Sequence, residues 1–208
     1  MTPDRYHHGD LPNALRRAAV DVIDEQGLGR FSLREVARRA GVSHTAPAHH
    51  FGDVRGLLTA LAIEGFDHLH DATAAAAARS ADAGEGPAER LAAIGEAYVA
   101  LAIEHPAHCQ VMFRTDVVDP DDAALRAAGV RAYDVLRDTI AALIDAEGLE
   151  IDVDLGSEFV WATVQGLVVL EPKLSSLDAL HGIEPIPVGA RVRRLTSLLL
   201  DGLRHASA

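Results

Sequence analysis

Four side chains between residues 105 and 112 have types and a spacing that could bind a metal ion. His105, His108, Cys109 and Met112 stand at i, i+3, i+4 and i+7, which places them on one face of a helix. Imidazole, thiolate and thioether groups suit zinc or copper. Pro106 interrupts this helix, however, and single histidines often have an ordinary structural role. Metal sensing is therefore an alternative interpretation, and the sequence assigns neither a metal nor a cofactor.

A second group of polar side chains, between residues 43 and 50, could read DNA. Hydroxyl and imidazole groups in this stretch offer donors and acceptors for base edges or phosphates. Arginines just before it suit phosphate contacts, although a solvated polar face is the competing interpretation. A short polar arm at the N-terminus could also reach DNA, or be a solvated tail. The residues expected to contact DNA are Arg5, His7, His8, Ser32, Arg34, Ser43, His44, Thr45, His49, His50 and Arg55.

These side chains require two short helices joined by a tight turn. Ser32 is a good N-cap, and Glu35 three residues later completes a capping box. An apolar face follows at Leu33, Val36, Ala37 and Ala40. Gly41 can end the first helix in the left-handed conformation, and Ser43 can cap a second helix running to about Phe51. This layout is typical of a helix-turn-helix, whose second helix enters the major groove of DNA.

The same stretch resembles the DNA-binding region of the TetR (tetracycline-repressor-like) regulators. The residues that carry the resemblance are Ser32, Leu33, Val36, Ala37, Ala40, Gly41, Val42, Ser43, His50, Phe51, Leu57 and Leu58, and Tyr6–Leu11 resembles the entry to one subgroup. The chain departs from the family pattern at Pro47-Ala48, where Leu-Tyr is usual, and at Val54, where Lys is usual. The absence of this tyrosine and this lysine bears on which operator is bound and how tightly. Arg55, next to Val54, could substitute for the lysine.

Composition indicates a globular protein built from helices. Of the 208 residues 49% are hydrophobic but only 4% aromatic, so Ala, Leu and Val must supply most of the core. The net charge is −12, yet residues 1–60 carry eight arginines and seven acidic residues, a formal +1, so the acidic excess lies in the remainder. A locally basic reader on an acidic body is compatible with DNA binding. One cysteine, no long apolar run and no signal-like N-terminus predict a cytoplasmic protein outside the membrane.

Helical periodicity runs along the whole chain. We expect helices from Leu11 to Gln26, the pair just described, and then at about 54–80, 88–104, 107–114, 121–146, 153–171 and 188–205. The fold class is therefore all-α, with about nine helices, the number found in the TetR family. The predicted domains are residues 1–53, a three-helix helix-turn-helix DNA-binding domain, and residues 54–208, a C-terminal helical domain for ligand binding and dimerisation.

The C-terminal part offers an effector region and a dimer surface. The helix at 153–171 is apolar on two faces, and the last helix carries an apolar stripe, which together predict a four-helix dimer interface. Residues 161–167 resemble the Trp-x-x-x-His-Gly-Leu signature of a TetR-family C-terminal domain, with Gln165 in place of histidine. The candidate effector-binding residues are Tyr98, His105, His108, Cys109, Met112, Phe113, Trp161 and Gln165, although several could be simple core. The candidate dimerisation residues are Leu155, Phe159, Leu170, Val192, Leu195 and Leu199.

The sequence thus predicts a ligand-responsive transcriptional regulator, expected to be a repressor. It would bind a palindromic operator as a homodimer and leave DNA when a small-molecule effector binds. No Gly-rich phosphate loop, nucleophile elbow or paired-carboxylate motif stands out, so we do not expect an enzyme. The alternative is a TetR-like protein that senses a small molecule or metal, or binds another protein, with DNA binding weakened or lost at Ala48 and Val54.

Overall fold

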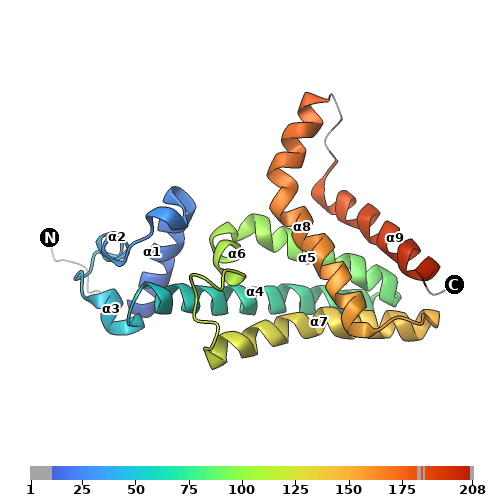
Figure 1. Cartoon of the computed structure of the whole chain (residues 1–208), viewed down its shortest axis with the longest axis horizontal. Helices are drawn as coiled ribbons and strands as arrows, with labels where there is room; N and C mark the ends of the chain where they lie inside the picture. Colours follow the sequence, from blue (N-terminus) through green and yellow to red (C-terminus); the bar gives the residue numbers. More distant parts are fainter. Residues whose placement is uncertain (1–10, 182–183, 185, 207–208) are drawn as a thin grey trace. The chain divides into compact units, whose positions relative to one another are not determined.

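The computed structural model describes residues 11–181, 184 and 186–206, and all regular structure in them is helical (Figure 1). The elements are α1 (Leu11–Gln26), the 3-10 turn η1 (Leu28–Arg30), α2 (Leu33–Arg39), α3 (Ala46–Phe51), α4 (Val54–Asp82), α5 (Pro87–Glu104), α6 (Pro106–Met112), α7 (Ala123–Glu147), α8 (Val153–Leu180) and α9 (Val188–Ala206). The predicted all-α fold is confirmed.

Two helices depart from their predicted bounds by more than the usual fraying. Ser43 was predicted to cap the second helix of the helix-turn-helix, whereas that helix begins at Ala46, after Thr45. The helix expected to end near Glu171 continues to Leu180, so the Pro172 position, predicted to lie in a loop, belongs to α8. A proline removes only one backbone donor, and a long helix retains enough other bonds to continue past it.

Contacts divide the chain into two compact units, and both α4 and α7 contribute to each of them. The first unit comprises the chain up to Phe66 together with His105–Gly129, and the second comprises Asp67–Glu104 together with the chain from Val130 onward. The predicted boundary between residues 53 and 54 separates a DNA-binding domain from a ligand-binding and dimerisation domain. It divides the chain by function, and it stays a prediction.

The core of the first unit joins stretches that are far apart in the sequence. Leu15 and Val22 of α1 pack with Val36 of α2, with Leu57 and Leu61 of α4, and with residues beyond α5. The residues from beyond α5 in this core are Ala107, Val111, Val118 and Leu125. Burying a side chain of the size of Leu or Val stabilises a fold by about 1.5–3 kcal/mol. Helix α6 and the loop after it are therefore part of the structure that holds α1 to α3 in place.

Two glycines let neighbouring helices approach α4 closely. A Cβ added at Gly56 would collide with the backbone carbonyl of Phe51, so glycine permits the tight connection from α3 into α4. A Cβ added at Gly65 would lie 2.7 Å from Sδ of Met112 and 3.0 Å from Cβ of His108. Glycine at position 65 therefore lets α6 rest directly on the backbone of α4.

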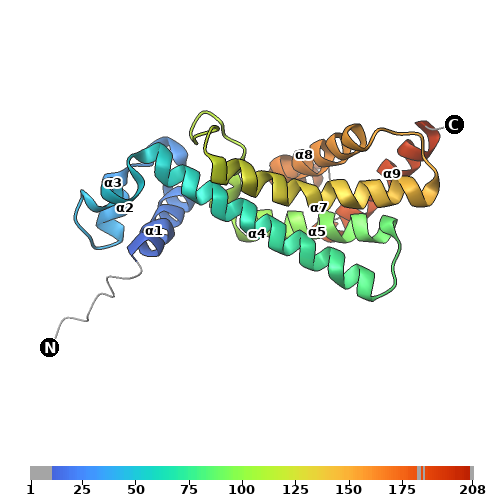
Figure 2. The same ribbon diagram turned by 90° about the horizontal axis from the view of Figure 1, so that it is seen from below.

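The second unit is built around α5. Its helices α5 and α9 pack along one another, and α8 contacts both. Leu91 and Ile94 of α5 pack with Ile140 and Leu143 of α7 and with Val160 of α8. The residues 83–86 form the short loop that joins α4 to α5 (Figure 2). Gly84 in this loop has φ of 72°, a conformation that glycine adopts without strain.

Candidate DNA-binding surface, effector residues and dimer surface

The turn between α2 and α3 is closed by backbone and side-chain hydrogen bonds. At the start of α2, the hydroxyl of Ser32 accepts from the backbone N–H of Glu35 at 3.3 Å. At its end, Gly41 has φ of 67°, and the N–H of Val42 donates to the carbonyl of Ala37 at 3.0 Å. Ser32, which we expected to contact DNA, therefore has a second task as the N-cap of α2.

The reading helix α3 is short, and Pro47 explains where it begins. The Ser43 hydroxyl accepts from the N–H of Thr45 at 3.3 Å, and the Ser43 carbonyl accepts from the N–H of Ala46 at 2.9 Å. Ser43 thus forms a turn instead of capping a helix. Pro47 is then the second residue of α3 and buried, in the first turn, where a proline ring causes no clash.

Polar side chains are exposed along this turn and helix. Each of the five residues predicted to read bases is exposed: Ser43, His44, Thr45, His49 and His50. The Ser43 and Thr45 hydroxyls lie 2.9 Å apart and can share a proton, while the rings of His49 and His50 are in edge contact at 5.5 Å. Ala48 is also exposed and offers only a methyl group.

Two of the three arginines on α2 are held by acidic side chains. Arg38 donates two hydrogen bonds to Glu35, at 2.8 and 2.6 Å, and this pairing lowers the pKa of Glu35 to about 2. Arg39 donates to both carboxylate oxygens of Glu25 on α1, one of them at 2.7 Å. Arg34 is exposed, as Arg38 is, and its contact with a phosphate stays a prediction.

Arg55 has a different environment from the one we expected. Its guanidinium donates to the backbone carbonyl of Val118 at 2.8 Å and to that of Asp116 at 3.3 Å. Nearby, the Thr59 hydroxyl accepts from the N–H of Asp119 at 2.8 Å and donates to the Arg55 carbonyl at 2.8 Å. Arg55 thus fastens the loop after α6 to α4, although its side chain is exposed, and its contact with DNA stays a prediction. Arg5, His7 and His8 lie outside the described residues.

Three of the predicted effector-binding residues lie in the second unit. The buried Tyr98 of α5 donates its hydroxyl proton to Oε1 of Gln165 on α8. The ring of Trp161, one turn earlier on α8, makes an edge contact with Tyr133 at 5.7 Å. The amide at position 165 therefore joins two helices through a polar bond inside an apolar setting.

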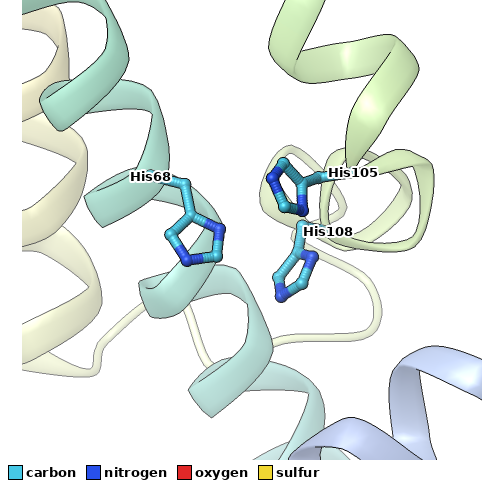
Figure 3. Close-up of side chains that lie close together, drawn as sticks. All are labelled: His68, His105 and His108. Atoms are coloured by element: carbon cyan, nitrogen blue, oxygen red, sulfur yellow. The ribbon is translucent and has the colours of Figure 1, made fainter.

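The other five lie around α6 in the first unit. His108 and Met112 are buried, and the Phe113 ring makes an edge contact with Phe66 at 5.5 Å. The rings of His105 and His108 lie 5.7 Å apart (Figure 3). Burial raises the pKa of the Cys109 thiol from 9.0 to about 11. This sulfur stays protonated near neutral pH, so the thiolate that a metal requires is disfavoured.

The predicted dimer stripe is exposed on α8 and largely buried on α9. Leu155 is 62% exposed, Phe159 47% and Leu170 45%. Val192 and Leu199, in contrast, are buried within their own chain, so their assignment to the dimer surface is wrong. Leu195 is half-buried against the same cluster as Val192. α9 turns this face inward because α5 packs along it, which the stripe itself could not reveal.

Helix α8 is apolar enough to raise the question of whether it could span a membrane. In the described residues, the segment Val153–Leu170 is long and apolar enough to span a bilayer by length and composition alone, with a mean hydropathy of 1.3. It nevertheless carries Asp154 and Glu158 and packs on α5 and α9. The core helix of a globular protein has the same properties, so this segment is weak evidence for insertion.

Comparison with known proteins finds two family models that match parts of this chain. Residues 15–61 match a model of bacterial regulatory proteins of the tetR family, and residues 91–174 match a model of the tetracyclin repressor-like C-terminal domain. The HTH-type transcriptional regulator BetI of Stenotrophomonas maltophilia is 39% identical over 80 residues, 38% of this chain and 39% of that protein. The tetracycline repressor class A from transposon 1721 of Escherichia coli is 43% identical over 51 residues, 24% of each chain. The chain thus spans about two fifths or less of the length of these curated relatives.

Solved structures resemble the chain over nearly its whole length. A protein of unknown function from Rhodococcus sp. RHA1 has a TM-score of 0.76 at 29% identity, covering 96% of this chain and 98% of that one. The fatty acid degradation regulator FadR from Bacillus halodurans has a TM-score of 0.73 at 18% identity, covering 96% and 99%. The second likeness supports the fold alone.

Proposed function

The chain belongs to the TetR family of transcriptional regulators, and on this premise we propose that it is a ligand-responsive repressor. In this proposal a homodimer binds a palindromic operator in the cytoplasm, and a small-molecule effector releases it. Its relatives are regulators that bind DNA and are not enzymes. The proposal therefore concerns the mode of regulation, the oligomer and the effector.

The arrangement of α2, Gly41 and α3 is the observation that carries the proposal. A helix-turn-helix needs a reading helix whose exposed side chains offer donors and acceptors, and α3 with the turn before it offers five. Of these, His44 lies in the turn, while His49 and His50 lie in the last turn of α3. We assign base contacts to this set and phosphate contacts to Arg34.

The charges around α2 and α3 favour a modest affinity for DNA of any base sequence. Glu25 and Glu35 bind Arg38 and Arg39, so two positive charges are balanced close to the contact face. Few phosphates would then be neutralised, and the loss of affinity with salt would be shallow, with a slope of about −0.9 per phosphate contact. Base contacts would then supply a larger share of the binding free energy than they do in a strongly basic DNA-binding domain.

Dimerisation is supported by the exposed apolar face of α8. Leu155, Phe159 and Leu170, together with the 61% exposed Val169, would be shielded from water by a second copy. A two-fold dimer can present two reading helices about 34–36 Å apart, which matches successive major grooves.

An effector would act by binding one state of the dimer more tightly than the other. We place its contacts among the predicted set, with Tyr98 and Gln165 as polar partners in an apolar setting. A ligand that displaced the Tyr98–Gln165 hydrogen bond would alter how α5 and α8 are joined. The chemical identity of the effector does not follow from these residues.

Operator selection tests the proposal directly. Purified protein is mixed with a pool of random duplexes at moderate salt, and the retained DNA is sequenced while sedimentation measures the oligomer. A dimer that enriches a palindrome is the expected result, and the recovered operator then serves to screen small molecules for release. A folded dimer that enriches nothing would overturn the repressor proposal and favour a sensing or interaction role without DNA.

A further inference from the structure

A cavity of about 510 Å³ lies in the second unit, beside the last turns of α4, the middle of α5 and the start of α9. Small-molecule sites occupy roughly 300–1,000 Å³, so this volume suits a small ligand. We propose that the cavity binds a small organic molecule with one carboxylate group and a compact apolar body. Of the described residues that line it, none belongs to the predicted effector-binding set, so the site is additional to the effector contacts proposed above.

The apolar part of the cavity is lined by small side chains. Three alanines of α5 stand at i, i+4 and i+7 and therefore share one face of that helix, which Ala76 of α4 and Val188 of α9 extend. The three are Ala93, Ala97 and Ala100. Methyl groups leave room beside the helix for a ligand of small cross-section, and they favour an apolar body over a charged one.

Ser80 supplies a buried polar group in the cavity wall. Its side chain is 3% exposed, and its Oγ has no hydrogen-bond partner within the part of the chain that the structure describes. Other buried hydroxyls of this unit donate to a carbonyl one turn earlier: Thr73 to Leu69 at 2.7 Å and Ser157 to Val153 at 2.7 Å. Since a buried hydroxyl without a partner is costly, an oxygen of the ligand would satisfy Ser80 and gain affinity.

Arg79 supplies the positive charge. It follows Ala76 by three residues and Ser80 by four, so both polar residues lie on the face of α4 that lines the cavity. The Arg79 side chain is exposed, and no ion pair or hydrogen bond holds it among the residues described. A guanidinium and a hydroxyl together offer donors to one carboxylate, and a charged acceptor makes these bonds stronger than neutral ones.

Glu96, the acidic side chain on the α5 wall, is already balanced. Nη1 of Arg193 on α9 lies 2.6 Å from its Oε1. A Cβ added at Gly189 would lie 3.7 Å from its Oε2, so this carboxylate also lies beside the start of α9, where the helix dipole favours a negative charge. Glu96 therefore does not require a cationic group from the ligand.

Two carboxylates in the lining limit the ligand to a single negative charge. Glu85, exposed in the loop after α4, lines the cavity together with Glu96. A second negative charge on the ligand would face these two side chains with only the Arg79 guanidinium to offset them, and like charges at short range repel. The lining thus favours a monocarboxylate over a phosphate or a dicarboxylate.

The experiment uses the full chain without DNA and measures binding by fluorine NMR. The probes are para-trifluoromethylbenzoate and a trifluorohexanoate, whose apolar bodies differ in shape. We expect saturable binding of at least one of them. The amide with the same apolar body should bind about tenfold more weakly, because it lacks the charge-assisted bonds. A trifluoromethylphthalate, with two carboxylates, should also bind more weakly than the benzoate.

Variants of the lining locate the bound probe. Arg79→Gln should weaken binding about tenfold and Ser80→Ala about fivefold, as expected for a charged and a neutral hydrogen bond. Ala100→Leu, at an exposed position, fills the cavity and should abolish saturation. The matched controls are Arg194→Gln and Ala78→Leu, which change exposed side chains outside the lining and should bind as the wild type does.

Three results would overturn the site. They are no saturable binding of either monocarboxylate by the folded wild-type chain, equal affinity for acid and amide, and unchanged binding in Ala100→Leu. Circular dichroism checks that each variant is folded, and Ser80→Ala should melt no lower than the wild type, because it removes a hydroxyl that has no partner in the described chain. The titration contains no DNA, so its failure contradicts this site alone and failure of operator selection contradicts the repressor alone.

Discussion

The guanidinium of Arg55 donates a hydrogen bond of 2.8 Å to the backbone carbonyl of Val118, across sixty-three positions of sequence. This bond ties the first turn of α4 to the loop after α6, and Thr59 adds a second tie to the N–H of Asp119. Both ties lie within the unit that carries the helix-turn-helix. A residue that could be taken for a phosphate contact therefore has a structural partner inside the chain.

Arg55→Ala should lower the free energy of unfolding by about 1 kcal/mol, because it removes hydrogen bonds from a partly exposed charged donor to two carbonyls. Urea unfolding followed by circular dichroism measures this change. Arg30→Ala, at an exposed arginine of the same unit, serves as the control and should alter stability by less than about 0.5 kcal/mol. Unchanged stability with a marked loss of operator affinity would instead return Arg55 to the DNA surface.

Arg34→Ala should weaken operator and random DNA by the same factor and reduce the salt slope by about one, as expected for one lost phosphate contact. Arg38→Ala is the matched comparison on α2 and should have a smaller effect, since Glu35 already holds that guanidinium. His44→Ala should instead relax base preference. Fluorescence anisotropy over a range of salt measures the slopes, and identical effects of the two arginine variants would contradict their different environments.

Phe159→Glu should convert the proposed dimer to a folded monomer, because it places a charge in the centre of the exposed apolar face of α8. Val192→Glu should instead unfold the second unit, since Val192 packs against Val99 and Leu167 and is 1% exposed. Sedimentation velocity and circular dichroism distinguish these results. Glu158→Gln, beside Phe159, provides the control for a change of charge at an exposed position. A Phe159→Glu protein that still sediments as a dimer would exclude this face.

Cys109 should react slowly with iodoacetamide in the folded protein at pH 8, because burial raises its pKa to about 11 and leaves little thiolate. The rate should rise as pH increases toward 11. In the unfolded chain the thiol has its ordinary pKa near 9.0, so stability is unaffected below that pH and falls as pH rises from about 9 to 11. Mass spectrometry of native and urea-unfolded samples compares the rates. Equal rates at pH 8 would show that the thiol is not shielded.

The local elements were predictable because their signals are local. Ser32, Glu35 and Gly41 mark the bounds of α2 through capping and left-handed backbone, and the structure has both features. The start of α3 is not predictable from residue types alone, because the turn at Ser43 depends on hydrogen bonds that the residue types do not distinguish from a cap. The sequence does not reveal the extra length of α8, because a proline is typical of a helix boundary and Pro172 stands inside this helix.

The features that the sequence did not predict depend on tertiary contacts between helices. The stripe on α9 was visible, but only the packing of α5 decides that Val192 faces its own core.

The composite first unit has a consequence for exchanging parts between related regulators. Ala107, Val111, Val118 and Leu125 belong to the same core as α1 and α2, so a fragment ending at Phe66 would leave an apolar surface open to water. A chimaera that borrows only the N-terminal segment must therefore also match the recipient's α6 and the loop after it. Transplanting residues 105–129 together with the chain up to Phe66 keeps both parts of this core in the chimaera.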